Sequence, residues 1–330
     1  MKFGPTPVAD AVGAVLAHSV ALPGGRLRKG RPLSSEDIAA LAAAGHESVI
    51  VARLDPMDVD ENTAAARLAA ALVPDPAARG LLVTEAFTGR VNLLAEGPGV
   101  ALLDVPALQA VNRIDPMISF ATVLPFQQMH TGGMVGTIKI ISYAVPEAPL
   151  AAACAAVGDG VRLAGPSARS AELIVTEIPG GAGDKGATAI ANRLAAFDIV
   201  LGRPRRVPHR VEALAQALTK SDADVTLILT GSATSDPFDV APEALRRAGG
   251  KVARFGMPVD PGNLLFIGHR SGRPVIGLPG CARSPALNGT DWVLARVVCG
   301  IDVSSEDIAG MGVGGLLKEI PSRPQPRRGG

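Results

Sequence analysis

The feature that most constrains the fold is a repeated order of apolar strand, loop and helix that begins at Ala171. Such repeats predict a mostly parallel sheet with helices on both faces, an α/β arrangement of three layers. We expect this domain to span residues 171–301. Strands are predicted at 173–178, 225–229 and 275–278, and helices at 187–197, 211–218, 242–248 and 286–298.

Three loops that follow the predicted strands contain most of the chemically useful residues. The carboxyl ends of parallel strands share one edge, where helix N-termini favour anions. We therefore expect the three loops to meet and to bind a phosphorylated small molecule. The first loop holds Gly183, Asp184, Lys185 and Gly186; the second holds Thr230, Gly231, Ser232, Thr234, Ser235 and Asp239; the third holds Pro279, Gly280, Arg283 and Ser284.

Each of these motifs also has a structural interpretation. Asp239 precedes Pro242, a residue favoured in the first helical turn, so it can cap a helix as well as serve a ligand. The glycine-rich first loop is also typical of a strand-to-helix turn without a ligand. Residues 203–206 form a basic run, which we interpret as a solvated loop rather than a phosphate clamp. Cys281 has no suitably placed histidine partner, so we do not expect it to be a nucleophile.

The chain before and after this domain predicts smaller units. Residues 1–73 indicate a small α+β unit, in which Ser34 can cap a helix and Gly45 ends it. Residues 74–150 indicate a β-rich middle unit that contains a short helix near Pro106. Residues 151–170 are rich in Ala, Gly and Ser and are expected to be a linker, and residues 302–330 a tail rich in Gly, Pro and Arg.

Composition narrows the function further. The net charge of +1 argues against broad nucleic-acid binding, which needs a basic face. The three cysteines have no metal-ligand spacing and are typical of a reducing compartment. No stretch is apolar enough for a membrane span or a secretion signal. We therefore expect a soluble, cytoplasmic protein whose cores consist of small aliphatic side chains, because aromatic residues make up only 3% of the chain.

The order and spacing of the loop motifs resemble those of the MoaB/Mog-type molybdopterin-binding domain of molybdenum cofactor biosynthesis. The similar elements are Gly183–Gly186, Val207-Pro208, Thr230–Asp239, Pro261-Gly262-Asn263 and Gly277–Gly280. The first 150 residues resemble a bacterial lineage of molybdopterin-binding proteins through Gly25–Gly30 and Ala86–Asn92. That lineage often continues into a nucleotidyltransferase domain, which this sequence does not include.

This resemblance implies that the chain binds molybdopterin, or its nucleotide form, in the biosynthesis or delivery of the cofactor. One alternative is an active molybdopterin adenylyltransferase or molybdate-insertion enzyme, with Asp239 as catalytic residue and Mg²⁺ ligand. Another is an α/β protein that binds a different phosphorylated metabolite. Two departures bear on catalysis: His209 stands where active relatives have an acidic residue, and Ser232 where they have glycine.

The resemblance also implies partners. A nucleotidyltransferase or a molybdoenzyme is expected as the partner chain, and a homo-oligomer because relatives are commonly dimers or trimers. The ligand is expected to be the pterin phosphate, with no nucleic acid and no membrane.

Overall fold

The computed structural model describes residues 1–183 and 185–317 and divides into two compact units. Unit 1 comprises residues 1–96, 101–127 and 131–163. Unit 2 comprises residues 97–100 and 128–130 together with the chain from Ala164 onward. None of the described helices is both long enough and apolar enough to cross a membrane.

The first part of unit 1 is a small sheet with one helix. Strands β1 (Lys2–Pro7), β5 (Ser48–Arg53) and β2 (Val15–Leu16) form the antiparallel sheet, while β3 (Val20–Leu22) and β4 (Gly25–Leu27) form a hairpin. A 3₁₀ turn, η1 (Val8–Asp10), and helix α1 (Ser35–Ala43) complete it.

Ser34 caps α1 as predicted. Its hydroxyl accepts from the Asp37 backbone N–H, and the Asp37 carboxylate accepts in return from the Ser34 backbone. That backbone bond, with the nearby Arg31, holds the pKa of Asp37 below its usual value.

The rest of unit 1 is an antiparallel sheet of order β10-β12-β8-β7 with helices packed against it. Its elements are β6 (Asp58–Asp60), α2 (Glu61–Leu72), β7 (Leu81–Val83), β8 (Arg90–Ala95), α3 (Val105–Ile114), β10 (Ile118–Thr122), β12 (Met134–Ile140), β13 (Ala144–Pro146) and α4 (Glu147–Ala155). Most of β9 (Gly99–Leu103) and of β14 (Val161–Ala164) also belongs to unit 1, whereas β11 (Gln128–Met129) belongs to unit 2.

Two predicted boundaries in this region differ from the structure. We placed a boundary at residue 73, but α2 packs on β8 and β12 and β6 pairs with β13, so residues 58–72 belong with the middle sheet. The reason is the buried face of α2, formed by residues such as Leu68 and Leu72. Residues 151–170 were expected to be a linker, but they include most of α4 and all of β14.

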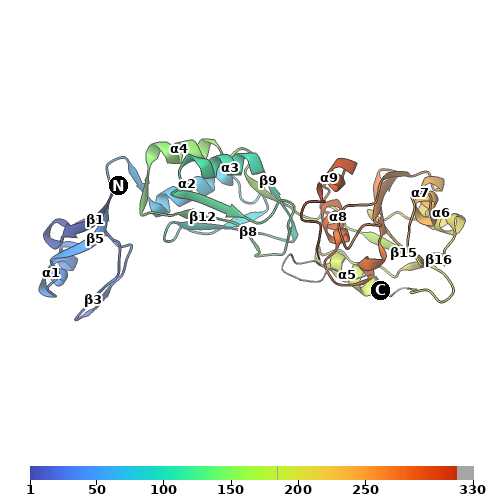
Figure 1. Ribbon diagram of the computed structural model, residues 1–330, viewed down its shortest axis with the longest axis horizontal. Helices are drawn as coiled ribbons and strands as arrows, with labels where there is room; N and C mark the ends of the chain where they lie inside the picture. Colours follow the sequence, from blue (N-terminus) through green and yellow to red (C-terminus); the bar gives the residue numbers. More distant parts are fainter. Residues whose placement is uncertain (184, 318–330) are drawn as a thin grey trace. The chain divides into compact units, whose positions relative to one another are not determined.

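Unit 2 contains the predicted α/β domain (Figure 1). Its six-stranded sheet has the order β16-β15-β17-β20-β19-β18; the first four strands are parallel, and β19 and β18 are antiparallel to their neighbours. The elements are β15 (Ala171–Glu177), α5 (Ala187–Ala195), β16 (Arg205–Pro208), α6 (Val211–Thr219), β17 (Val225–Leu229), α7 (Val240–Arg247), β18 (Lys251–Phe255), β19 (Phe266–Arg270), β20 (Arg273–Leu278), η2 (Gly280–Arg283), α8 (Gly289–Val298) and α9 (Ser305–Gly310).

Helices cover both faces of this sheet, which confirms the three-layer prediction. In Figure 1, α6 and α7 lie on one side of β15, and α5 and α8 lie on the other. The α6–α7 side contains a closed core in which Ile174 and Ile228 of the sheet meet Leu214 and Leu245 of the helices. The central strands β15, β17 and β20 contain continuous apolar runs because both faces of the sheet are buried there.

The predicted tail contains a folded segment. Helix α9 buries Ile308, and Val303 and Met311 beside it are also buried. The Asp260 N–H donates to the Gly315 carbonyl oxygen, and the Leu317 N–H donates to the Asp260 carbonyl oxygen. These two hydrogen bonds tie the segment to the loop after β18. The Gly- and Pro-rich composition concealed this short helix, and residues 318–330 lie outside the described part.

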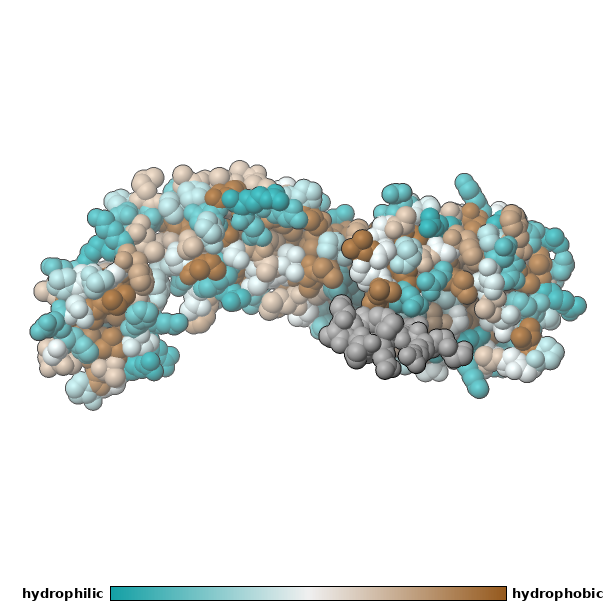
Figure 2. Space-filling model, in the orientation of Figure 1, coloured by the Kyte–Doolittle hydropathy of each residue, from teal (hydrophilic) through white to brown (hydrophobic). Residues whose placement is uncertain are grey.

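The surface of unit 2 is mixed rather than patchy. Figure 2 shows its hydrophobic residues scattered among hydrophilic ones on the visible face. Single exposed apolar side chains such as Val200 and Phe238 are normal in soluble proteins and do not by themselves indicate an interface.

Candidate binding site

The carboxyl edge of the parallel strands in unit 2 brings four loops together. Residues 178–186 connect β15 to α5, residues 230–239 connect β17 to α7, and residues 279–288 connect β20 to α8. These are the three loops predicted from the sequence. The fourth is the short connection at 209–210 between β16 and α6, which places His209 at the same edge.

Arg283 holds the three predicted loops together. Its Nη1 donates to the carbonyl oxygens of Gly183 (2.9 Å) and Lys185 (2.5 Å), and its Nη2 donates to that of Thr230 (2.9 Å). Burial lowers the pKa of the guanidinium, which stays charged at neutral pH. We predicted that Arg283 contacts an anion; the structure shows it bonded to three carbonyl oxygens, so its observed role is to fix the loops.

Gly186 makes this arrangement possible. A Cβ atom at this position would lie 2.5 Å from the Cα of Arg283, and the backbone φ of +96° lies in a region that other residues rarely adopt. Gly183 also has a positive φ but has open space around it. The two glycines therefore serve different purposes: Gly186 permits the close approach of Arg283, and Gly183 permits a turn.

Asp239 caps α7 and closes the second loop. One carboxylate oxygen accepts from the Val240 N–H (2.7 Å) and the other from the Ser235 N–H (3.0 Å). The capping interpretation is thus confirmed. The hydroxyls of Thr230 and Thr234 lie 3.3 Å apart, with Thr234 buried, whereas Ser232 is exposed.

The third loop is held by Arg193, a residue that the sequence did not single out. Its nearly buried guanidinium pairs with Asp291 at 2.7 Å and donates to the carbonyl oxygens of Ala282 (3.0 Å) and Ser284 (2.9 Å). The available signal was an arginine within the predicted helix at 187–197, but its partners lie about 90 residues further along the chain and cannot be identified by spacing alone.

Thr176 is a second residue that the sequence analysis missed. It is fully buried at the end of β15, where its hydroxyl accepts from the Gly231 N–H (2.9 Å) and lies 2.7 Å from Nδ1 of His209. The available signal was a hydroxyl residue directly after the apolar run Leu173–Val175. This contact links the fourth loop to the second.

The remaining predicted residues lie at the same edge with fewer contacts. Lys185 is exposed, Pro279 is buried, Gly280 is exposed, and the Ser284 hydroxyl accepts from the Ala286 N–H at 3.2 Å. Asp184 lies outside the described residues. Within residues 1–183 and 185–317, no group of three or more His, Cys, Asp or Glu side chains is placed to hold a metal ion.

The electrostatics of this edge favour an anion. Helices α5, α6, α7 and α8 all begin here, and each helix start carries partial positive charge. Asp239 caps α7 and Asn288 caps α8, whereas α5 and α6 have no side-chain cap and leave N–H groups available to a ligand. Lys185 and the exposed hydroxyl of Ser232 add further donors. A phosphate group is the ligand chemistry that such an arrangement recognises.

Comparison with known proteins gives two family matches. Residues 157–295 match the family described as "Probable molybdopterin binding domain", and residues 5–53 match a domain of unknown function (DUF8806). The second match coincides with the small sheet and helix at the start of unit 1. The comparison with curated proteins gives no match.

Solved structures of molybdopterin biosynthesis moeA proteins are also similar. One from Pyrococcus horikosii has 14% identity and a TM-score of 0.33, and one from Pyrococcus horikoshii OT3 has 11% identity and a TM-score of 0.26. Each comparison covers 91% of this chain and 75% of the other. These TM-scores are too low to support an argument, so the assignment rests on the matched domain.

Proposed function

We propose that the carboxyl edge of unit 2, within a domain of the molybdopterin-binding family, binds the phosphate end of molybdopterin or of its nucleotide form. The observation that supports this most directly is the convergence of three loops on Arg283 beside the uncapped starts of α5 and α6. The family match supports a role in molybdenum cofactor biosynthesis. Binding, rather than turnover, is the activity we propose.

In this proposal the loops act through donors. Satisfying carbonyl oxygens with Arg283 and Arg193 removes acceptors that would repel an anion. The starts of α5 and α6, which have no side-chain cap, supply the backbone donors. Lys185 contributes a mobile positive charge from the first loop, and Ser232 a hydroxyl from the second. These interactions recognise a phosphate on any carrier, so the pterin ring must be selected by contacts around them.

The described residues do not form a magnesium cage. Both oxygens of Asp239 already accept backbone N–H bonds, and among the described residues Asp239 is not part of a group of three or more His, Cys, Asp or Glu side chains placed to hold a metal ion. Magnesium in proteins often takes most of its ligands from substrate phosphates and water. No step of the proposal involves magnesium, and adding or chelating it is an arm of the test.

The experiment is a titration of the purified chain with molybdopterin, followed by intrinsic or ligand fluorescence, with and without Mg²⁺. We expect saturable binding that Lys185→Ala weakens by roughly three- to tenfold, since one exposed charge–phosphate contact contributes about 1 kcal/mol. Lys220→Ala is the matched control, because Lys220 is also an exposed lysine but lies at the C-terminal end of α6. The absence of binding, or equal binding of AMP, would overturn the proposal.

The same samples address the alternatives. Incubation with molybdopterin, ATP and Mg²⁺ tests adenylyl transfer, and incubation with molybdate tests insertion. The predicted nucleotidyltransferase or molybdoenzyme partner and the homo-oligomer stay predictions, which copurification and light scattering test. The predicted cytoplasmic location is tested by fractionation.

A further inference from the structure

The fourth loop of the binding edge carries an imidazole that is held against the neighbouring strand. His209 is half-buried directly after β16, and its backbone N–H donates to the Glu177 carbonyl (2.9 Å). Its Nδ1 lies 2.7 Å from the hydroxyl oxygen of Thr176. One edge of the ring is therefore fixed against the buried end of the neighbouring strand.

The hydrogen-bond partners of the Thr176 hydroxyl determine which ring nitrogen of His209 carries the proton. A buried hydroxyl oxygen accepts readily, but leaving its proton without an acceptor costs free energy. Two groups contact this oxygen in the described part of the chain: the Gly231 N–H, which can only donate, and His209 Nδ1, which can accept. The hydroxyl proton therefore goes to Nδ1, and the ring proton resides on Nε2.

We infer that Thr176 is a positioning residue that holds His209 as the Nε2–H tautomer, so that the imidazole presents its Nε2–H donor to the ligand's phosphate. The contact with the ligand rests on the proposed function, whereas the tautomer of His209 does not depend on it. The Nε2 atom lies on the ring edge away from Thr176, and no hydrogen-bond partner for it is found among residues 1–183 and 185–317.

A donor at this place explains how the edge can receive an anion without a metal ion. A carboxylate at position 209 would repel a phosphate unless a cation lay between them, whereas an N–H donor contacts the phosphate directly. Thr176 also binds the Gly231 N–H, so one hydroxyl sets both the second loop and the imidazole. The inference predicts phosphate binding that EDTA does not change.

The first test is made on the ligand-free chain. The ¹⁵N chemical shifts of the histidine ring nitrogens are measured at a pH above the usual titration range of histidine, and His209→Gln identifies the His209 signals by their loss. We expect a protonated Nε2 and an unprotonated Nδ1, with Thr176→Ser preserving this state. Thr176→Val is expected to give a mixture of tautomers. A protonated Nδ1 in the unmodified chain would overturn the inference, even if Thr176→Val does not fold.

The second test is molybdopterin binding by two variants of His209. The amide nitrogen of glutamine reaches the place of Nε2, whereas that of asparagine reaches the place of Nδ1. We expect His209→Gln to bind within about twofold of the unmodified chain and His209→Asn roughly tenfold more weakly, the value of one hydrogen bond to a charged group. Equal affinities for the two variants would refute the donor role. An unmodified chain that does not bind molybdopterin would refute the proposed function, while the tautomer measurement would still decide the role of Thr176.

Discussion

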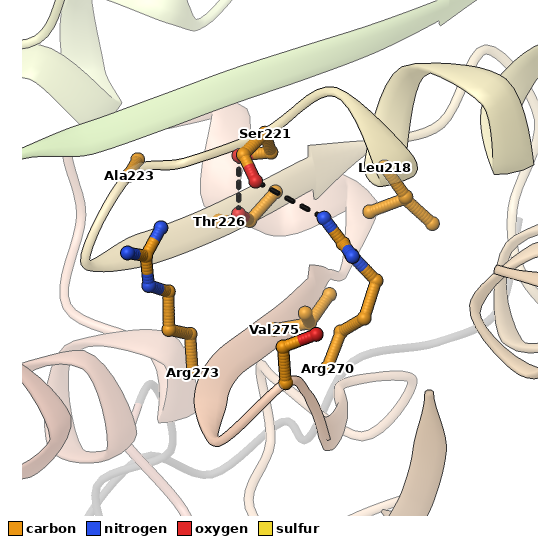
Figure 3. A pocket seen from close by; sticks show the side chains of 8 residues that line it. Leu218, Ser221, Ala223, Thr226, Arg270, Arg273 and Val275 are labelled. Atoms are coloured by element: carbon orange, nitrogen blue, oxygen red, sulfur yellow. Dashed lines mark hydrogen bonds between the residues drawn. The ribbon is translucent and has the colours of Figure 1, made fainter. Parts of the chain in front are cut away.

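The two edges of the sheet in unit 2 use arginine in the same way, but only the carboxyl edge has the electrostatics of an anion site. At the carboxyl edge, Arg283 donates to loop carbonyl oxygens. At the amino edge, Arg270 donates to the carbonyl oxygens of Thr219 (3.0 Å) and Ser221 (3.1 Å), and Arg273 donates to that of Asp222. Figure 3 shows the contact between Arg270 and Ser221. What differs is the direction of the neighbouring helices.

The amino edge has a cavity but not the electrostatics of an anion site. A space of about 250 Å³ lies among residues such as Leu218, Thr226 and Val275, with both arginines at its rim. Thr219 is the last residue of α6, so Arg270 satisfies carbonyl groups at the negative end of a helix. The arginine charge is used to neutralise the helix end.

The comparison teaches that neither a cavity nor a pair of arginines locates an anion site in this fold. Helices start at the carboxyl edge and end at the amino edge, and the starts of α5 and α6 have no side-chain cap. At the carboxyl edge arginine assembles the loops, and in our proposal these two helix starts provide the donors. The predictions below test this difference, beginning with the largest expected effect.

Gly186→Ala should produce the largest loss. The added Cβ would overlap the backbone of Arg283 and would also be strained at φ +96°. We expect binding of molybdopterin to fall by roughly a hundredfold, about 2.7 kcal/mol, since the loop must move away from Arg283.

The matched control for this variant is Gly180→Ala. Gly180 also has a positive φ, +71°, but nothing lies within 4 Å of its Cβ position. It should retain most of the affinity and lose only the stability that strain costs, about 1 kcal/mol. Isothermal titration and thermal unfolding separate the two effects; equal losses of affinity would show that the contact with Arg283 does not matter.

Arg283→Ala and Arg270→Ala test the two edges directly. The first leaves three loop carbonyls without their donor and should weaken binding by roughly ten- to thirtyfold. The second removes the cap of α6 and should cost about 1 kcal/mol of stability without changing affinity. Binding and unfolding are measured on both variants. A loss of affinity in Arg270→Ala would indicate that the ligand binds at the amino edge and would contradict the proposal.

Much of this site could be predicted from sequence because its main signals are local. Buried parallel strands read as apolar runs, and loops after them share an edge by geometry, which is why residues 178–186 and 230–239 were found. Capping by Asp239 and Ser34 could also be predicted, since a cap interacts within four residues.

The braces of the site could not be predicted in the same way. Arg193 and Arg283 bind partners roughly 50 to 100 residues away, at carbonyl oxygens that every residue possesses. Nothing in the identity of Gly183 or Thr230 marks its carbonyl as an acceptor. The boundary near residue 73 failed for a related reason: an alanine-rich helix does not reveal which of two sheets it covers.

The smallest expected effect concerns acid stability at the amino edge. The Asp224 carboxylate accepts from the backbone N–H groups of Arg169 (2.8 Å) and Ser170 (3.0 Å) and from the Ser170 hydroxyl, and the bond from Arg169 contributes most to holding its pKa below the usual 3.8. A depressed pKa means that this stabilisation is present above pH 3.8 and is lost as the pH falls through the lower, folded-state value. Asp224→Asn should therefore lower the melting temperature slightly at pH 7 and flatten its decline in acid, while molybdopterin affinity at neutral pH stays unchanged. An unaltered acid profile would mean that other carboxylates govern it. A changed affinity would mean that the amino edge is coupled to ligand binding, against the separation of the two edges argued above.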